Sequence, residues 1–127
     1  MNGMTHPGSL LASARRILAG AERDAARGLH MSACAGAHRA AAMATEAWLR
    51  ASGQPIVSAS VLENVCLAPD SAPDVREAGR LLDRHRIDEG PHGSATMIGG
   101  SAPEAEAALG ASRRVVEFAS GRMDAIG

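Results

Sequence analysis

The sequence has no Lys and no Tyr, and only one Phe and one Trp among its 127 residues. All thirteen basic residues are therefore Arg, a bias typical of GC-rich coding sequence. A chain with so few large side chains must draw its elements close together, or bury one face against another subunit, to gain enough buried area. We therefore expect a homodimer.

Other features that are scarce exclude several classes of protein. No apolar segment approaches the roughly 20 residues that cross a bilayer, and the stretch from Met1 to Ser9 has no basic region followed by an apolar run, as a signal peptide would have. Cys34 and Cys66 lack the paired spacing of a zinc or redox site, so both are expected to be buried free thiols. Neither a metal site nor a phosphate-binding Gly loop is evident, so no cofactor is expected. The sequence fits a cytoplasmic protein without membrane contact.

Charge also limits the partners. A formal net charge of −1 disfavours a protein that coats nucleic acid through bulk electrostatics, so any contact with RNA would be local. A helix-turn-helix DNA-binding protein ranks last among the alternatives, because the chain has no basic recognition helix.

Alanine makes up about a fifth of the chain and β-branched residues are scarce, which favours helix over sheet. Apolar residues at helical spacing predict two long helices, one capped by Ser9 and running to about Arg27, and one over 30–51. The segment 58–67 predicts a short third helix, although a strand is left open there. Residues 1–8 are expected to be a flexible N-terminus.

Two similar start signals predict the remaining helices. Ser71 and Asp74 form one capping box, which opens a helix to about Ile87, and Ser101 and Glu104 form a second, which opens the last helix. The Gly-rich segment 88–100 between them is expected to be a loop. Together these elements predict a single all-α domain over 1–127, an antiparallel four- to five-helix up-and-down bundle without a sheet.

The densest polar cluster lies where the fourth predicted helix passes into this loop. Arg86 and His92 are separated by five residues, so the chain can leave the helix and bring the imidazole towards the guanidinium. Such a pair suits RNA cleavage without metal: His92 exchanges a proton with the 2′-hydroxyl or the leaving oxygen, and Arg86 stabilises charge on the phosphate. The other interpretation is a solvated helix end, in which Asp83, Arg84, Arg86 and Asp88 form ordinary ion pairs. Similarly, His38 is interpreted as a core or interface histidine rather than a ligand.

The order of these features resembles the HEPN family, small helical bundles that are often paired with minimal nucleotidyltransferases. The resemblance covers most of the chain. It rests on an Ala-rich second helix, a later helix and a terminal helix, which read ARGLHMSACAGAHRAAAMATEAWLRASG, LLDRHRIDEGPH and EAALGASRRVVEFASGRM. The family signature is an Arg followed about four to six residues later by a His, and Arg86 and His92 match it.

This resemblance implies a bundle that dimerises so that two Arg/His pairs form one cleft. It implies a metal-independent endoribonuclease with Arg86 and His92 as catalytic residues. Arg84 and His85, which lie in the same polar cluster, are the expected substrate-binding residues. The resemblance also implies a nucleotidyltransferase-type partner, as in toxin–antitoxin pairs. Gly93 and Ser94 follow His92 where the toxin subgroup has a Tyr. The alternative function is a non-catalytic helical module that binds a partner protein or a nucleotide.

Overall fold

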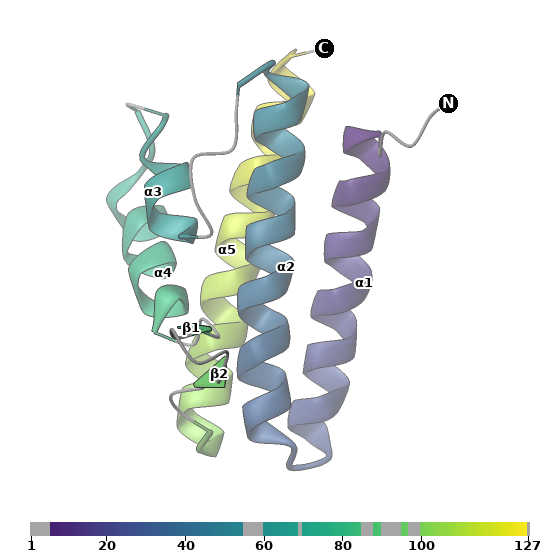
Figure 1. The fold of residues 1–127 in the computed structure, drawn as a ribbon, viewed down its shortest axis with the longest axis vertical. Coiled ribbons are helices and arrows are strands. Elements are labelled where there is room, and N and C mark those ends of the chain that lie inside the picture. Colours follow the sequence, from purple (N-terminus) through teal and green to yellow (C-terminus); the bar gives the residue numbers. More distant parts are fainter. Residues whose placement is uncertain are drawn as a thin grey trace.

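The computed structural model describes residues 6–54, 60–68, 70–84 and 100–126, together with the backbone of 88–89 and 95–96. Five helices and one pair of very short strands make up this part of the chain. Figure 1 shows that α1 (Pro7–Ala26), α2 (His30–Ala51), α4 (Pro73–Asp83) and α5 (Ala102–Ile126) alternate in direction along the chain. The all-α, up-and-down bundle is therefore confirmed.

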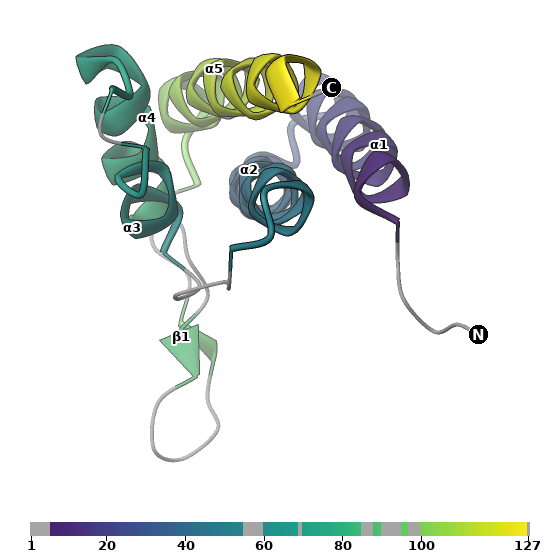
Figure 2. The ribbon, with the colours of Figure 1, turned by 90° about the horizontal axis from the view of Figure 1, so that it is seen from above.

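Helix α2 occupies the inside of the bundle. Seen from above, α1, α5, α4 and the short α3 (Val61–Val65) form an arc around it, and none of the described helices lies against its remaining side (Figure 2). Small side chains allow this close packing, since a Cβ on Gly36 of α2 would lie only 2.9 Å from the Cβ of Ala21 on α1. The buried core is mostly alanine with a few branched side chains, among them Leu18, Leu49, Val61, Leu82 and Val115.

The predicted turn between the first two helices is confirmed. Gly28 has a φ of +81°, and the Leu29 N–H donates to the Asp24 carbonyl at 2.9 Å, which closes α1 with a Schellman motif. The predicted start of α1 is wrong. The Nδ1 atom of His6 accepts from the Gly8 N–H at 3.1 Å and caps the helix, so Pro7 and Gly8 belong to α1 rather than to a flexible N-terminus.

The second capping box is confirmed at the start of α5. The Glu104 N–H donates to Ser101 Oγ at 3.2 Å, and the Ser101 N–H donates to Glu104 Oε1 at 3.3 Å. The first capping box is wrong. Ala72 precedes α4 without a side-chain cap, because Ser71 Oγ instead accepts from Arg76 Nε at 2.8 Å.

The third and fourth helices differ in length from the prediction. The segment 58–67 forms helix α3 over Val61–Val65, which excludes the strand alternative for these residues. Helix α4 ends at Asp83 rather than near Ile87. Within the predicted loop 88–100, β1 (Asp88–Glu89) pairs antiparallel with β2 (Ala95–Thr96), a ladder too short for a period-two pattern to reveal. The expectation of no strand pairing at all was therefore wrong, although the fold class stands.

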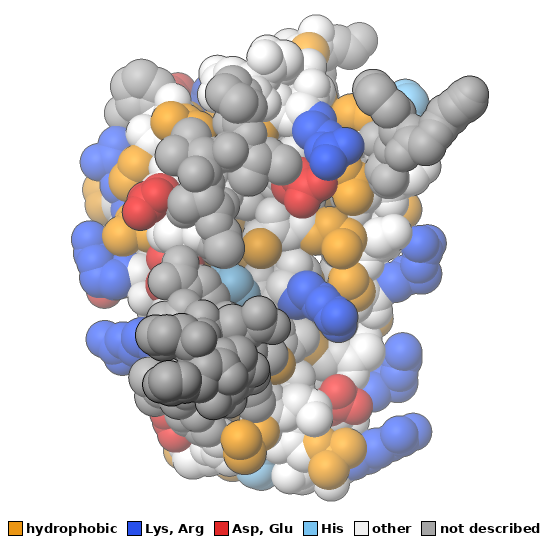
Figure 3. Space-filling view, viewed as in Figure 1, with side chains coloured by type: hydrophobic (Ala, Val, Ile, Leu, Met, Phe, Trp, Pro, Cys, Tyr) orange, Lys and Arg blue, Asp and Glu red, His pale blue; other side chains and the backbone are white. Residues whose placement is uncertain are grey.

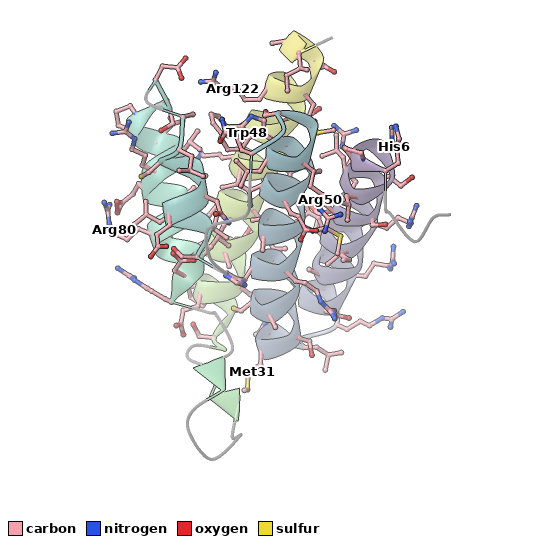
Figure 4. All side chains as sticks on the ribbon, turned by 45° about the horizontal axis from the view of Figure 1, so that its top comes forward. His6, Met31, Trp48, Arg50, Arg80 and Arg122 are labelled. Carbon is pink, nitrogen blue, oxygen red and sulfur yellow. The ribbon has the colours of Figure 1, made fainter. Side chains whose placement is uncertain are left out.

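An aromatic contact joins α2 to α5 near the upper end of the bundle. Trp48 and Phe118 meet edge to face, with ring centroids 5.5 Å apart. The Arg122 guanidinium lies 5.3 Å from the centre of the Phe118 ring and also forms an ion pair with Asp70 (Figure 4). These contacts fix the C-terminal part of α5 onto α2 and onto the segment before α4. No helix in the described ranges is long and apolar enough to span a bilayer.

Candidate functional site

The polar cluster predicted from sequence begins at the C-terminus of α4. Asp83 is the last residue of this helix, and Arg84 follows in an exposed turn. His85, Arg86 and His92 lie outside the described residues. The geometry of the site is therefore built from Asp83, Arg84 and the side chains that contact them.

Asp83 binds the N-terminus of α3. One carboxylate oxygen, Oδ2, accepts from the Ser60 hydroxyl at 2.6 Å, and the other, Oδ1, accepts from the Val61 N–H at 2.9 Å. The Leu62 N–H lies 3.3 Å from Oδ2. A carboxylate suits this place because the first N–H groups of a helix have no partner within the helix. The end of α4 is thereby tied to the start of α3.

Ser60 is the N-cap of α3 and completes this contact. Its Oγ accepts from the Glu63 N–H at 3.1 Å while its hydroxyl hydrogen goes to Asp83, so both functions of the hydroxyl are used. The side chain is almost fully buried, with 7% of the residue exposed. The sequence Ser60-Val-Leu-Glu63 has the spacing of a capping box and gave a usable signal for this helix start.

His38 brings α2 into the same cluster. Its Nε2 atom lies 3.5 Å from Asp83 Oδ1, and 12% of its side chain is exposed. At this distance the contact is an ion pair when the imidazole is protonated, and it is longer than a well-formed hydrogen bond. The interpretation of His38 as a core or interface histidine agrees with its mostly buried side chain, which contacts the end of α4.

The environment of Asp83 favours its charged form. Burial alone would raise the pKa of this carboxyl. The contacts from His38, from the Ser60 hydroxyl and from the Val61 and Leu62 amides outweigh burial and hold the pKa below its usual value. Asp83 is therefore an anion at neutral pH, at the junction of α2, α3 and α4.

The arrangement of these three side chains suits anchoring rather than nucleophilic catalysis. The carboxylate lies between the hydroxyl and the imidazole, so His38 has no contact through which it could remove the proton of Ser60. Asp83 instead holds the last turn of α4 in place directly before residues 84–92. Sequence periodicity could not reveal this, because His38, Ser60 and Asp83 come from three separate elements.

Other candidate ligands remain apart. In the part of the chain that the structure describes, no three His, Cys, Asp or Glu side chains come together as a metal site would require. Cys34 is buried and Cys66 is exposed, and both thiols are free. The prediction of a buried thiol is therefore confirmed for Cys34 and wrong for Cys66, which follows the last residue of α3.

The fold is similar to solved structures. The crystal structure of an archaeal HEPN homologue superposes with a TM-score of 0.80 at 15% sequence identity, over 94% of this chain and 99% of that chain. The crystal structure of TT1696 from Thermus thermophilus superposes with a TM-score of 0.79 at 25% identity, over the same shares of the two chains. No protein-family model and no curated protein matches the sequence. The chain therefore has a HEPN-like fold.

Proposed function

We propose that the protein is an endoribonuclease of HEPN type, which cleaves RNA as a homodimer without a metal ion. The observation that carries the proposal is the HEPN-like fold over nearly the whole chain, combined with an Arg/His pair of HEPN spacing directly after α4. Arg86 and His92 are the proposed catalytic residues. The cytoplasm, where cellular RNA is accessible, is the proposed compartment.

The proposed chemistry needs one proton exchange and one charge stabiliser. The 2′-hydroxyl of RNA attacks the adjacent phosphate, and the bond from phosphorus to the 5′-oxygen breaks. His92 accepts the proton of the attacking hydroxyl in one protonation state, or donates a proton to the leaving oxygen in the other. Arg86 stabilises the additional negative charge on the phosphate. Arg84 and His85 bind the phosphate backbone beside the cleaved bond.

One structural feature supports assigning this chemistry to the end of α4, and another supports the proposed dimer. Asp83, the last residue of α4, is held by its hydrogen bonds with Ser60 and the Val61 amide. The chain therefore leaves α4 towards the Arg/His segment from a fixed position. A core made mostly of alanine also gains from the area that a second subunit would bury. Two copies of the Arg/His pair in one cleft would supply an acid and a base together.

The direct test is RNA cleavage by purified protein in EDTA, on structured and unstructured RNA. The native protein should cleave, and Arg86→Ala and His92→Ala should each lower the rate by about 100-fold or more, the usual effect of losing an acid–base or charge-stabilising group. Arg114→Ala is the matched control, because its side chain is exposed on α5 and lies outside the Arg/His segment. Light scattering of the same samples measures the molar mass and so determines whether the protein is a dimer.

Absence of cleavage by a native dimer would overturn the ribonuclease proposal. The alternative is then a non-catalytic helical module that binds a partner protein or a nucleotide. A nucleotidyltransferase-type protein is the partner to test first, by co-expression and co-purification with the native chain and with His92→Ala. Equal capture of both forms, with no cleavage, would support the binding module.

A further inference from the structure

The near-neutral net charge conceals an uneven distribution of charge along the sequence. Helices α1 and α2, with the turn between them, carry six arginines and three carboxylates, whereas the rest of the chain carries seven arginines and eleven carboxylates. The first two helices are therefore basic, and the remainder of the sequence is acidic. A local basic surface can attract a polyanion even when the whole protein is slightly acidic.

Three arginines form a single line along α1 and its C-cap. Arg16, Arg23 and Arg27 are exposed, and their spacing of seven and four residues puts them on one face of the helix, opposite its buried face. We call this line the α1 arginine stripe. It spans about 16 Å along the helix axis at 1.5 Å per residue. Figure 3 shows arginine side chains spaced along the α1 edge of the molecule, and Figure 2 places α1 at one end of the arc.

The stripe arginines differ from four arginines elsewhere in having no acidic partner. Within the described ranges, no carboxylate forms an ion pair with any residue of the stripe, and Arg16 donates to the Ser13 hydroxyl. On α2, α4 and α5, by contrast, ion pairs neutralise Arg50, Arg80, Arg113 and Arg122, whose partners are Glu46, Glu77, Glu22 and Asp70. Three guanidinium groups on the outer face of α1 thus have no carboxylate partner among the described residues.

The neighbouring residues leave the stripe accessible. Small residues surround the three exposed arginines on the outer face of α1: Ala12, Ala19, Gly20 and Ala26. The acidic residues of α1 lie to either side of this face: Glu22 turns towards α5, where it binds Arg113, and Asp24 lies on the other flank. A planar guanidinium binds phosphate through two parallel hydrogen bonds.

We propose that the α1 arginine stripe binds the phosphate backbone of an RNA strand. This inference rests on the proposed ribonuclease function for the identity of the polyanion. A membrane surface is a poorer fit, because an interfacial helix inserts its apolar face into the lipid, whereas the apolar face of α1 is buried against α2 and α5. The stripe would bind the strand at the opposite end of the arc of helices from α4 (Figure 2), which would lengthen the footprint on the substrate.

The test measures binding separately from cleavage. All variants carry His92→Ala, and the probe is a fluorescent single-stranded RNA, followed by anisotropy at several KCl concentrations. Replacing Arg16, Arg23 and Arg27 by Gln should weaken binding by about tenfold or more at low salt. It should also reduce the slope of log K against log[salt] by about two, since each phosphate contact in a single strand contributes about 0.7.

A second triple variant has the same net charge and serves as the control. It replaces Arg50, Arg80 and Arg114 by Gln, three exposed arginines on α2, α4 and α5. Figure 4 shows Arg80 on the α4 side of the bundle, away from α1. It should change RNA affinity by less than about threefold, because bulk charge alone has a small effect at moderate salt. Thermal melting followed by circular dichroism confirms that both variants are folded.

Equal losses in the two triple variants would overturn the inference, and so would unchanged binding in the stripe variant. The outcome is independent of catalysis. A native protein that binds RNA through the stripe but does not cleave it would refute only the ribonuclease proposal. Cleavage by the native protein, with binding unaffected by the stripe, would refute only the stripe. A stripe variant that loses binding to an acidic protein but not to RNA would also refute the stripe as an RNA site.

Discussion

The Asp83 carboxylate accepts a 2.6 Å hydrogen bond from the hydroxyl of Ser60, although the two residues are 23 positions apart in the chain. The bond joins the last residue of α4 to the N-cap of α3. Through it, α3 contacts the helix end that directly precedes the segment with Arg86 and His92. The stability of this junction is therefore the first property to test.

Replacing Asp83 by Asn should lower the free energy of unfolding by about 1–3 kcal/mol, because an amide group cannot accept all the bonds that the carboxylate makes with Ser60 and Val61. Urea unfolding followed by circular dichroism measures the change. Glu117→Gln, on the exposed face of α5, removes one carboxylate of similar kind and should stay within about 0.5 kcal/mol of the native protein. An equal loss in both variants would contradict the anchoring role.

The same carboxylate predicts how stability depends on pH. The contacts of Asp83 hold its pKa below its usual value in the folded protein, so the unfolded chain binds the proton more tightly. The stability that Asp83 contributes is therefore complete above its unfolded pKa of about 3.9 and is lost as the pH falls through its folded pKa.

Urea unfolding of the native protein and Asp83→Asn between pH 7 and pH 2.5 tests this dependence. The difference in unfolding free energy between the two proteins should be largest near neutral pH and should shrink below about pH 4, where the native side chain also becomes neutral. Part of the pH dependence should survive in the variant, because the hydrogen bond from Arg122 also lowers the pKa of Asp70. A difference that grows as the pH falls would show that the sign is wrong.

The long helices could be predicted from sequence because their signals are local. Alanine content and helical spacing indicate α1, α2 and α5, and the reciprocal bonds of Ser101 and Glu104 follow from a four-residue pattern. The same pattern failed at Ser71, where the Arg76 side chain occupies the hydroxyl that would have capped the helix. A local pattern identifies possible caps, but neighbouring side chains decide which of them form.

The candidate site was less predictable for a related reason. Asp83 was recognised only as part of a polar helix end, since its partners Ser60 and His38 become neighbours only when α2, α3 and α4 pack together. Met31 shows the same effect for an apolar position. Its helical spacing puts it on the same face of α2 as the buried Cys34, but it is 52% exposed and lies against Gly100, just before α5. Helical spacing defines a face, whereas the neighbouring elements define how much of it is covered.

Two glycines at helical positions should respond to alanine in opposite directions. On α4, a Cβ at Gly79 would lie 3.0 Å from the Leu62 Cα atom and 3.1 Å from its nitrogen, so Gly79→Ala must push α3 away. We expect a loss of about 1–3 kcal/mol and a lower Tm. On α5, a Cβ at Gly110 would meet nothing within 4 Å, so Gly110→Ala should gain about 0.5–1 kcal/mol from helix propensity.

Thermal unfolding of the two variants beside the native protein measures both changes. The pair controls for the substitution itself, since each adds one methyl group to a helix. A gain of stability at Gly79 would mean that α3 and α4 do not pack as closely as the Cα and nitrogen distances of Leu62 require. A loss at Gly110 would instead indicate that this face of α5 is covered in solution, as it would be by a second subunit.

The two cysteines should differ sharply in reactivity. Burial, with a smaller contribution from the Glu104 carboxylate, raises the pKa of the Cys34 thiol, and its side chain is fully buried. Cys66 is exposed at the end of α3. Because the thiolate is the reactive form and must also reach the reagent, the folded protein should titrate one thiol rapidly with a disulfide reagent at pH 8 and two after unfolding. Cys66→Ser should abolish the rapid phase, and Cys34→Ser should preserve it. Two rapid thiols in the folded native protein would contradict this prediction, because they would show that the packing around Cys34 on α2 opens.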